Sequence, residues 1–256
     1  MGVVLNEVKQ AEEILRTGEV GDKPTSTLFL LARYFRQKEG LTPKPTRLKL
    51  DEFMRKNYKN YNSAKWEDIL ENIAGKALKY PLREIEYIGI TQKELDTVSN
   101  IHDIKYEKLL FTMLCYAKLY DTISETNNGW VNTDIQELYK VARVAVKYRK
   151  DKFLYLNDLE QSGLISFSNK NDNLNMRITF VDCENEPVLF IYDFRELGYE
   201  YLNYFEQDSF FRCEMCNILS MKKGRIGPPT KYCQICAKIK KNEQNKFYAA
   251  DKKNRK

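Results

Sequence analysis

Four cysteines near the C-terminus have the spacing of a metal site. They occur as two pairs, Cys213 with Cys216 and Cys233 with Cys236, and each pair encloses two residues. This short spacing lets both thiolates of a pair bind one ion, and the 16 residues between the pairs are enough for a hairpin that returns the second pair to the first. Four thiolates around one ion favour Zn²⁺. The sequence therefore predicts one structural zinc ion held by these cysteines.

Two other uses of the cysteines stay open, a pair of disulfides and an iron–sulfur cluster. Nothing in the sequence indicates export to an oxidising compartment, which argues against disulfides. A module of this size buries too little apolar surface to fold by itself, so we expect metal binding to stabilise it as a zinc ribbon. Turn residues suited to the tip of its hairpin lie between the pairs: Gly224, Gly227, Pro228 and Pro229.

Positive charge is concentrated around the cysteines. The 256 residues include 42 Lys and Arg against 36 Asp and Glu, a net charge of +6. Residues 212–256 contain 13 basic and three acidic residues, a net charge of +10, which leaves −4 for the first 211. A cationic module on a nearly neutral body is typical of nucleic-acid-binding proteins, although a solubilising tail is also basic. The candidate nucleic-acid contacts of this module are Lys222, Lys223, Arg225, Lys231, Lys238, Lys240 and Lys241.

The remaining composition narrows the class of protein. Hydrophobic residues make up 43% of the chain and aromatic residues 12%, which is enough for a buried core. No apolar run approaches the roughly 20 residues of a membrane-spanning helix, and the N-terminus lacks the pattern of a secretory signal. We therefore expect no membrane partner and a location in the cytoplasm of a bacterial or phage-infected cell.

Residues that could carry catalysis are few. The chain has one histidine, His102, and no Walker loop, dinucleotide-binding glycine pattern or nucleophile elbow. Asp182, Glu184 and Glu186 form a carboxylate cluster that could hold Mg²⁺, but a solvated acidic loop is the simpler interpretation. The sequence predicts that the protein is not an enzyme.

The middle of the chain has the element order of a winged helix. Hydrophobic periodicity and capping residues predict a long apolar helix, a short strand, two helices and then two strands around a polar turn. The helix that stops at Gly163 is the expected recognition helix. The expected elements are helices over 105–120, 134–142 and 148–161, with strands at 130–132, 164–168 and 176–181.

Three short segments of this region resemble the winged-helix domains of plasmid replication initiators and phage replisome organisers. They are residues 117–120 (Ala-Lys-Leu-Tyr), 128–132 (Asn-Gly-Trp-Val-Asn) and 159–165 (Leu-Glu-Gln-Ser-Gly-Leu-Ile). The resemblance covers about residues 105–182, under a third of the chain. It implies a DNA-binding protein of a phage or mobile element that acts in replication or as a transcriptional regulator.

Cations at the start of the expected recognition helix support binding to duplex DNA. A helix that enters the major groove needs cations for phosphates and forked donors for base edges. Lys170 and Arg177 on the wing are placed to meet the backbone or the minor groove. Alternatively, the winged helix and the ribbon dock onto a protein or ribonucleoprotein assembly, and the chain is an adaptor or host-modulating protein. The candidate contacts at the helix are Arg143, Lys147, Arg149, Lys150 and Lys152.

Taken together, the patterns predict an α+β fold that is mainly helical. We expect a helical N-terminal region over 1–100, a winged-helix domain with an extra strand and helix over 101–205, and a zinc ribbon with a basic tail over 206–256. The sequence from Thr91 to Glu94 has the form of a capping box, which starts a helix. A later helix over 197–205 carries three tyrosines, which we expect to pack against the body rather than to stack on bases.

Overall fold

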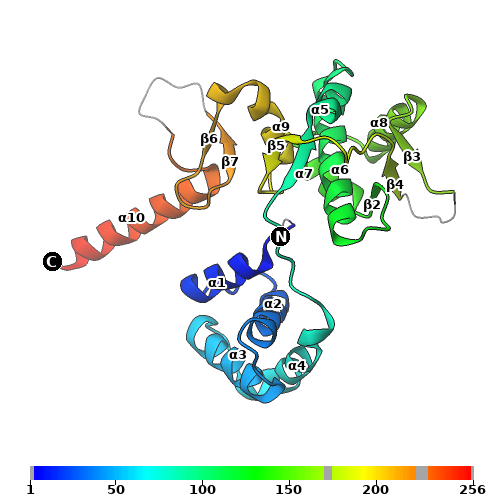
Figure 1. Ribbon diagram of the computed structural model, residues 1–256. Coiled ribbons are helices and arrows are strands. Elements are labelled where there is room, and N and C mark those ends of the chain that lie inside the picture. Colours follow the sequence, from blue (N-terminus) through cyan, green and yellow to red (C-terminus); the bar gives the residue numbers. More distant parts are fainter. Residues whose placement is uncertain (1–2, 170–174, 223–229, 255–256) are drawn as a thin grey trace. The chain divides into compact units, whose positions relative to one another are not determined.

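The chain folds into two compact units, one formed by Val4–Glu86 and a larger one that begins at Tyr87. The computed structural model describes residues 3–169, 175–222 and 230–254, with the backbone alone for residues 149, 243 and 246–254 (Figure 1). Helices dominate both units and the larger one adds small antiparallel sheets, which confirms the mainly helical α+β class. The domain limits expected after residues 100 and 205 stay predictions. Among the described residues, no helix is long and apolar enough to cross a bilayer.

The N-terminal unit is a group of helices around one core. Asparagine side chains cap two of the helices, and proline occupies the first turn of the other two, where no intrahelical N–H is needed. Gly18 ends the first helix in the left-handed region, where a Cβ would lie 2.2 Å from the amide oxygen of Asn57. Leu28, Leu50 and Met54 lie at the centre of the core. The elements are α1 (Glu7–Thr17), α2 (Pro24–Gln37), α3 (Pro43–Asn57), α4 (Ser63–Lys76) and the short 3₁₀ helix η1 (Ala77–Lys79).

A buried carboxylate joins the two ends of the N-terminal unit. Glu7 accepts hydrogen bonds from both terminal nitrogens of Arg33 at 2.7 and 2.9 Å. It also accepts from the backbone N–H of Arg83 at 2.8 Å and from that guanidinium at 3.1 Å. Burial by itself raises the pKa of Glu7, but the bonds and charges of the two arginines outweigh burial and bring the pKa below its usual value. The carboxylate therefore stays charged. The hydrogen bonds between Glu7 and Arg83 therefore hold the start of α1 against the last residues of the unit.

A second carboxylate, Asp51, organises the connection between α3 and α4. It accepts hydrogen bonds from the hydroxyls of Tyr61 and Ser63, each at 2.5 Å, and from Nε of Arg55 at 2.6 Å. Burial raises the pKa of Asp51, but these donors outweigh it and lower the value to about 2. Burial and the bond to Asp51 raise the pKa of Tyr61 to about 12. The charged form of Asp51 is therefore the one that the fold stabilises.

The larger unit alternates short strands with helices. Among its described residues, the strands pair in the orders β1-β5, β2-β4-β3 and β6-β7, and these pairs are antiparallel. The elements before the wing are β1 (Ile88–Thr91), α5 (Gln92–Ser99), α6 (Ile104–Ile123), β2 (Trp130–Val131), α7 (Ile135–Val141) and α8 (Arg149–Gln161). The remaining elements are β3 (Ile165–Phe167), β4 (Met176–Ile178), β5 (Pro187–Ile191), α9 (Leu197–Phe205), η2 (Gln207–Ser209), β6 (Phe210–Arg212), β7 (Leu219–Met221) and α10 (Gln234–Asn254).

The central part of this unit has the order of helices and strands that the sequence analysis expected of a winged helix. The chain order α6-β2-α7-α8-β3-β4 is the order that the sequence predicted. Strand β4 lies between β2 and β3, with Trp130 opposite Arg177 and Ile165 opposite Ile178 (Figure 1). Gly163 has a φ of +71°, which lets the chain leave α8 directly into β3. In the predicted winged helix, α8 would be the recognition helix and the β3–β4 hairpin would be the wing.

Helix α6 is the central element of the larger unit. Every side chain from Leu109 to Ala117 is buried, because neighbouring elements surround the helix. Helix α9 packs along it, with the rings of Phe111 and Tyr201 5.1 Å apart. The hydroxyl of Tyr201 donates to Glu107 at 2.9 Å. The packing role expected for the tyrosines of α9 is thus observed for Tyr201.

A buried ion pair connects α5, α6 and the segment after the wing. Thr91 and Glu94 form the predicted capping box at the start of α5. Glu94 is fully buried, and Nζ of Lys118 on α6 donates to its two oxygens at 2.8 and 2.9 Å. The same lysine donates to the carbonyl of Asp182 at 2.9 Å, while the N–H of Asp182 donates to Glu94 at 2.8 Å. Three elements distant in sequence therefore share one set of charged hydrogen bonds.

The carboxylate of Asp182 belongs to the same network. It accepts hydrogen bonds from the side chain and N–H of Asn185, from the N–H of Glu184 and from the hydroxyl of Thr91. The bond from the Asn185 side chain, followed by those from the backbone, lowers the pKa of Asp182 to about 2. Both carboxylate oxygens of Asp182 are therefore bonded to groups of the protein, which is typical of a structural carboxylate.

Removal of the Lys118 ammonium tests the importance of this network. We expect Lys118→Ala to lower the free energy of unfolding by about 3–5 kcal/mol, because Glu94 would remain buried without a counter-charge. Urea unfolding of the full chain measures the change. Lys93→Ala, which removes an exposed lysine of α5, is the matched control and should change stability by less than about 0.5 kcal/mol. Equal effects of the two substitutions would contradict this account.

The low pKa of Asp51 predicts how acid affects the N-terminal unit. The unfolded chain binds a proton at Asp51 near pH 4, whereas the folded chain does so near pH 2. The free energy of unfolding should therefore fall as the pH drops from about 4 to 2. Asp51→Asn should remove that part of the pH dependence, because no carboxylate remains to titrate. Hydrogen exchange of residues 4–86 across this pH range measures both proteins, and parallel pH profiles would refute the prediction.

Candidate metal centre and nucleic-acid interface

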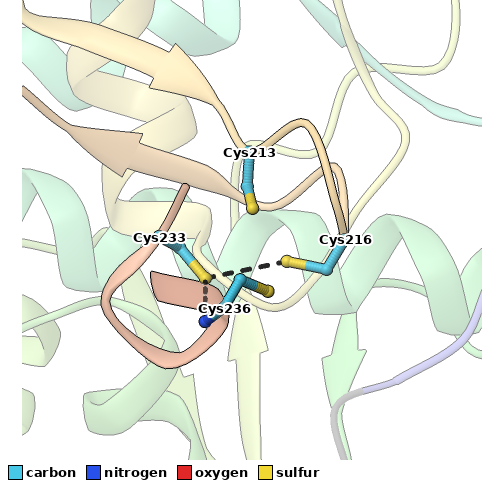
Figure 2. A group of neighbouring side chains, drawn as sticks. All are labelled: Cys213, Cys216, Cys233 and Cys236. Carbon is cyan, nitrogen blue, oxygen red and sulfur yellow. Dashed lines mark hydrogen bonds between the residues drawn. The ribbon is translucent and has the colours of Figure 1, made fainter. Parts of the chain in front are cut away.

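The first cysteine pair lies in the turn of the β6–β7 hairpin. The N–H of Cys213 donates to the carbonyl of Ile218 at 3.0 Å, and the N–H of Asn217 donates back to Cys213 at 2.8 Å. Asn217 has a φ of +56°, a left-handed conformation that asparagine tolerates better than most residues. This tight turn directs Cys213 and Cys216 to the same side of the hairpin (Figure 2).

The second pair lies at the start of α10. Cys233 immediately precedes the helix and Cys236 is in its first turn. The N–H of Cys236 points at the sulfur of Cys233 at 3.5 Å. Free N–H groups and the helix dipole at such a position favour thiolates. The turn residues 224–229 of the hairpin that the sequence predicted between the pairs lie outside the described residues, so the zinc ribbon stays a prediction.

The four sulfur atoms converge on one point. They all lie within 4.8 Å of one another, and those of Cys216 and Cys233 are 3.7 Å apart (Figure 2). Four Zn–S bonds of about 2.3 Å in a tetrahedron place the sulfurs about 3.8 Å apart. A disulfide needs about 2.05 Å, and all four cysteines are free thiols. The cluster therefore fits a single metal ion such as zinc.

The thiols differ in their acidity. Burial raises the pKa of Cys213, but backbone N–H groups of Cys233, Cys216 and Met215 lower it to about 6. Burial raises the pKa of Cys216, and burial together with the neighbouring thiols raises that of Cys236. One thiolate thus forms readily while others keep their protons, and a metal ion must displace those protons to bind.

Arginines attach the cysteine cluster to the rest of the larger unit. Arg195 donates to the carbonyl of Cys216 at 2.8 Å and is itself held by Asp193. Arg212 on β6 donates to both oxygens of Glu200 on α9 at 3.1 Å. Glu200 is buried, and this burial raises its pKa despite the arginine. The sequence analysis did not find these residues, because nothing in their spacing relates them to the cysteines.

At the start of α8, two of the expected cations are exposed. The ammonium groups of Lys147 and Lys150 lie 5.0 and 5.8 Å from the ring centre of Tyr148. Lys152 is half-buried, with its ammonium 5.1 Å from the ring of Tyr139. Arg149 is the first residue of α8, and its side chain lies outside the description.

Arg143 has a partner within the protein. Its guanidinium forms a two-pronged ion pair with the buried Glu196 and lies 5.5 Å from the ring of Tyr199. The backbone at Arg143 is left-handed, with a φ of +54°. Next to this turn, a Cβ on Gly198 would lie 2.0 Å from the carbonyl oxygen of Ala142. The ion pair of Arg143 with Glu196 therefore holds the turn before α8 against α9.

The other expected contacts are distributed over the wing and the C-terminal module. Arg177 on β4 is exposed, and its Nε donates to the carbonyl of Asn128 at 2.8 Å. Lys231 lies 3.3 Å from Glu214. Lys170, Lys223 and Arg225 lie outside the described residues. Lys222, directly after β7, is exposed, as are Lys238, Lys240 and Lys241 on α10.

Comparison with known proteins identifies no relative. No family model matches the chain, and neither a curated protein nor a solved structure is significantly similar to it. The likeness to replication initiators and replisome organisers therefore depends on the three short segments alone. What the geometry shows by itself is a four-cysteine cluster able to bind one metal ion.

Elemental analysis tests the metal centre. We expect one zinc ion per chain, and we expect Cys233→Ser to lose it, because three thiolates bind zinc less tightly than four. The first turn of α10 would then lose its anchor, so protease should cut residues 206–256 faster. Cys183→Ser, which removes an exposed cysteine outside the cluster, is the control and should keep both metal and protection. Stoichiometric zinc in Cys233→Ser would contradict the assignment.

Proposed function

We propose that this protein binds duplex DNA and that it serves the replication or transcription control of a phage or mobile element. The observation that carries the proposal is the pair of exposed lysines, Lys147 and Lys150, at the start of α8 in a winged-helix arrangement. Helix N-termini attract phosphate through free N–H groups and the helix dipole, and lysines strengthen that attraction. No catalytic step is required of the protein in this role.

The wing and the C-terminal module extend the proposed interface. Arg177 is exposed on β4, within the β3–β4 hairpin that would follow the DNA backbone. On α10, Lys238 and Lys241 are exposed within two turns of Cys236. A metal ion that fixes the first turn of α10 would fix these lysines too, so that less conformational entropy is lost on binding.

The role in replication or transcription control is a more specific proposal than DNA binding itself. It is supported by the resemblance of residues 105–182 to the winged helices of replication initiators and replisome organisers. The concentration of basic residues after position 211 is consistent with a second DNA contact in such a protein.

A second candidate function is supported by apolar side chains on the same helix. Tyr148 is 51% exposed and Leu154 is 58% exposed, and both lie on or next to α8. Large exposed apolar residues are more typical of a protein interface than of a contact with phosphates. They favour the adaptor alternative, in which the winged helix docks onto a larger assembly.

Salt-dependent binding distinguishes the two functions. If Lys147 and Lys150 contact phosphates, then Lys147→Ala and Lys150→Ala should each weaken binding to a blunt duplex. Each should also flatten the log–log dependence of affinity on salt by about one unit. Fluorescence anisotropy of a labelled duplex at several salt concentrations measures both quantities.

Lys93→Ala is the matched control, because it removes an exposed lysine of the same unit far from α8 in sequence. An unchanged affinity and salt slope in both α8 variants, with their folds intact, would reject DNA binding by α8. Association with a protein that survives nuclease and high salt would then favour the adaptor.

A further inference from the structure

A hollow lies beside the outer face of the wing sheet. It is bounded by the C-terminal end of α6 and by strand residues, among them Tyr120, Ile123, Trp130, Asn132 and Asn175. Its volume of about 420 Å³ falls in the range of small-molecule sites, about 300–1,000 Å³. Among the described residues, no charged side chain lines it. The hollow is separate from the cysteine cluster and from the start of α8.

Strand alternation explains how Trp130 reaches this face. Val131 and Met176 are opposite each other and buried, so they face the core. Their neighbours Trp130 and Arg177 are also opposite each other and therefore face outward together. Trp130 lines the hollow, and Arg177 lies opposite it on the neighbouring strand.

Hydrogen bonds hold the surrounding loop in place. The carboxylate of Asp121 accepts from the side chain of Asn127 and from the N–H of Gly129, both at 2.8 Å. Asn127 also donates to the carbonyl of Trp130 at 2.9 Å. Arg177 uses Nε to bind the carbonyl of Asn128, so its orientation is fixed. These bonds therefore hold the backbone at Trp130 in place before any ligand arrives.

Several polar groups of the hollow are unused. Within the part of the chain that the structure describes, the indole N–H of Trp130 and the amides of Asn132 and Asn175 have no hydrogen-bond partner. An indole offers a π-face, and an amide both donates and accepts. This set is complementary to a flat, uncharged ring that carries donors and acceptors at its edge, as a nucleobase does.

We propose that this hollow binds an unpaired base of single-stranded nucleic acid. The base stacks on Trp130, its edge meets the amides of Asn132 and Asn175, and a neighbouring phosphate lies at Arg177. Stacking of bases on aromatic side chains combined with nearby cations is the usual basis of single-strand binding. A sugar ring could also cover an indole, but it would leave the guanidinium without a counter-charge. The inference rests on the proposed function, because it gives the DNA-binding protein a site for a melted or tailed end.

Tryptophan fluorescence provides a direct test. The chain has two tryptophans, and Trp66 lies in the N-terminal unit among Tyr58 and Tyr61. Trp66→Phe leaves Trp130 as the only reporter. We expect its emission to be quenched by a six-nucleotide thymidine strand and by a duplex with such a tail. The same blunt duplex and a neutral oligosaccharide should leave the emission unchanged.

Substitutions in the hollow test whether the quenching of Trp130 reports binding of the tailed duplex. Trp130→Leu should weaken binding of the tailed duplex by about 5- to 150-fold and leave the blunt duplex unaffected. Asn175→Ala should weaken it less. Tyr192→Ala removes an aromatic side chain that is 61% exposed directly after β5, which belongs to another sheet, and is the matched control.

The outcomes separate this inference from the proposed function. Binding of blunt duplex without quenching by the tail or the free strand would overturn the inference and leave the proposed function intact. Quenching by the free strand without duplex binding would support the base site and reject the proposed function. Quenching by the oligosaccharide alone, or equal losses in Trp130→Leu and Tyr192→Ala, would overturn the base site.

Discussion

The ion pair between Glu94 and Lys118 is the constraint on which the larger unit depends. In an interior of low dielectric, a carboxylate and an ammonium are tolerated only when their remaining hydrogen-bonding positions are satisfied. Glu94 therefore requires the N–H groups of Thr91 and Asp182, and Lys118 requires the carbonyl of Asp182. These demands fix α5, α6 and the segment after the wing in one geometry. Helix α6 then provides the surface against which α9 packs, and α9 in turn holds the arginine of β6.

Ion pairing also decides which cations remain for a partner. Several basic residues that look equivalent in sequence are bound to carboxylates in the fold, as Arg143 is to Glu196 and Lys231 is to Glu214. Lys147 and Lys150 are exposed at the start of α8 beside an aromatic ring. Net charge therefore indicates a class of partner, whereas the distribution of carboxylates determines the surface that such a partner would meet.

The features that the sequence predicted are those that depend on the spacing of neighbouring residues. Two close cysteine pairs, the capping box from Thr91 to Glu94 and the period of each helix are properties of neighbouring residues, and the structure contains all of them. The sequence did not predict that Arg143 meets a carboxylate 53 residues later, or that Arg195 binds the carbonyl of Cys216. Those contacts arise from tertiary packing. The pairing of Trp130 with Arg177 likewise depends on a register that only the assembled sheet establishes.

Helix α9 places two buried carboxylates one helical turn apart. Glu196 precedes its first residue and binds the arginine of the turn before α8, while Glu200 binds the arginine that leads into the cysteine cluster. Both arginines are therefore held by the same nine-residue helix. Loss of the order of α9 would release them together, so the turn before α8 and the strand that leads into the cysteine hairpin would lose their anchors in one event.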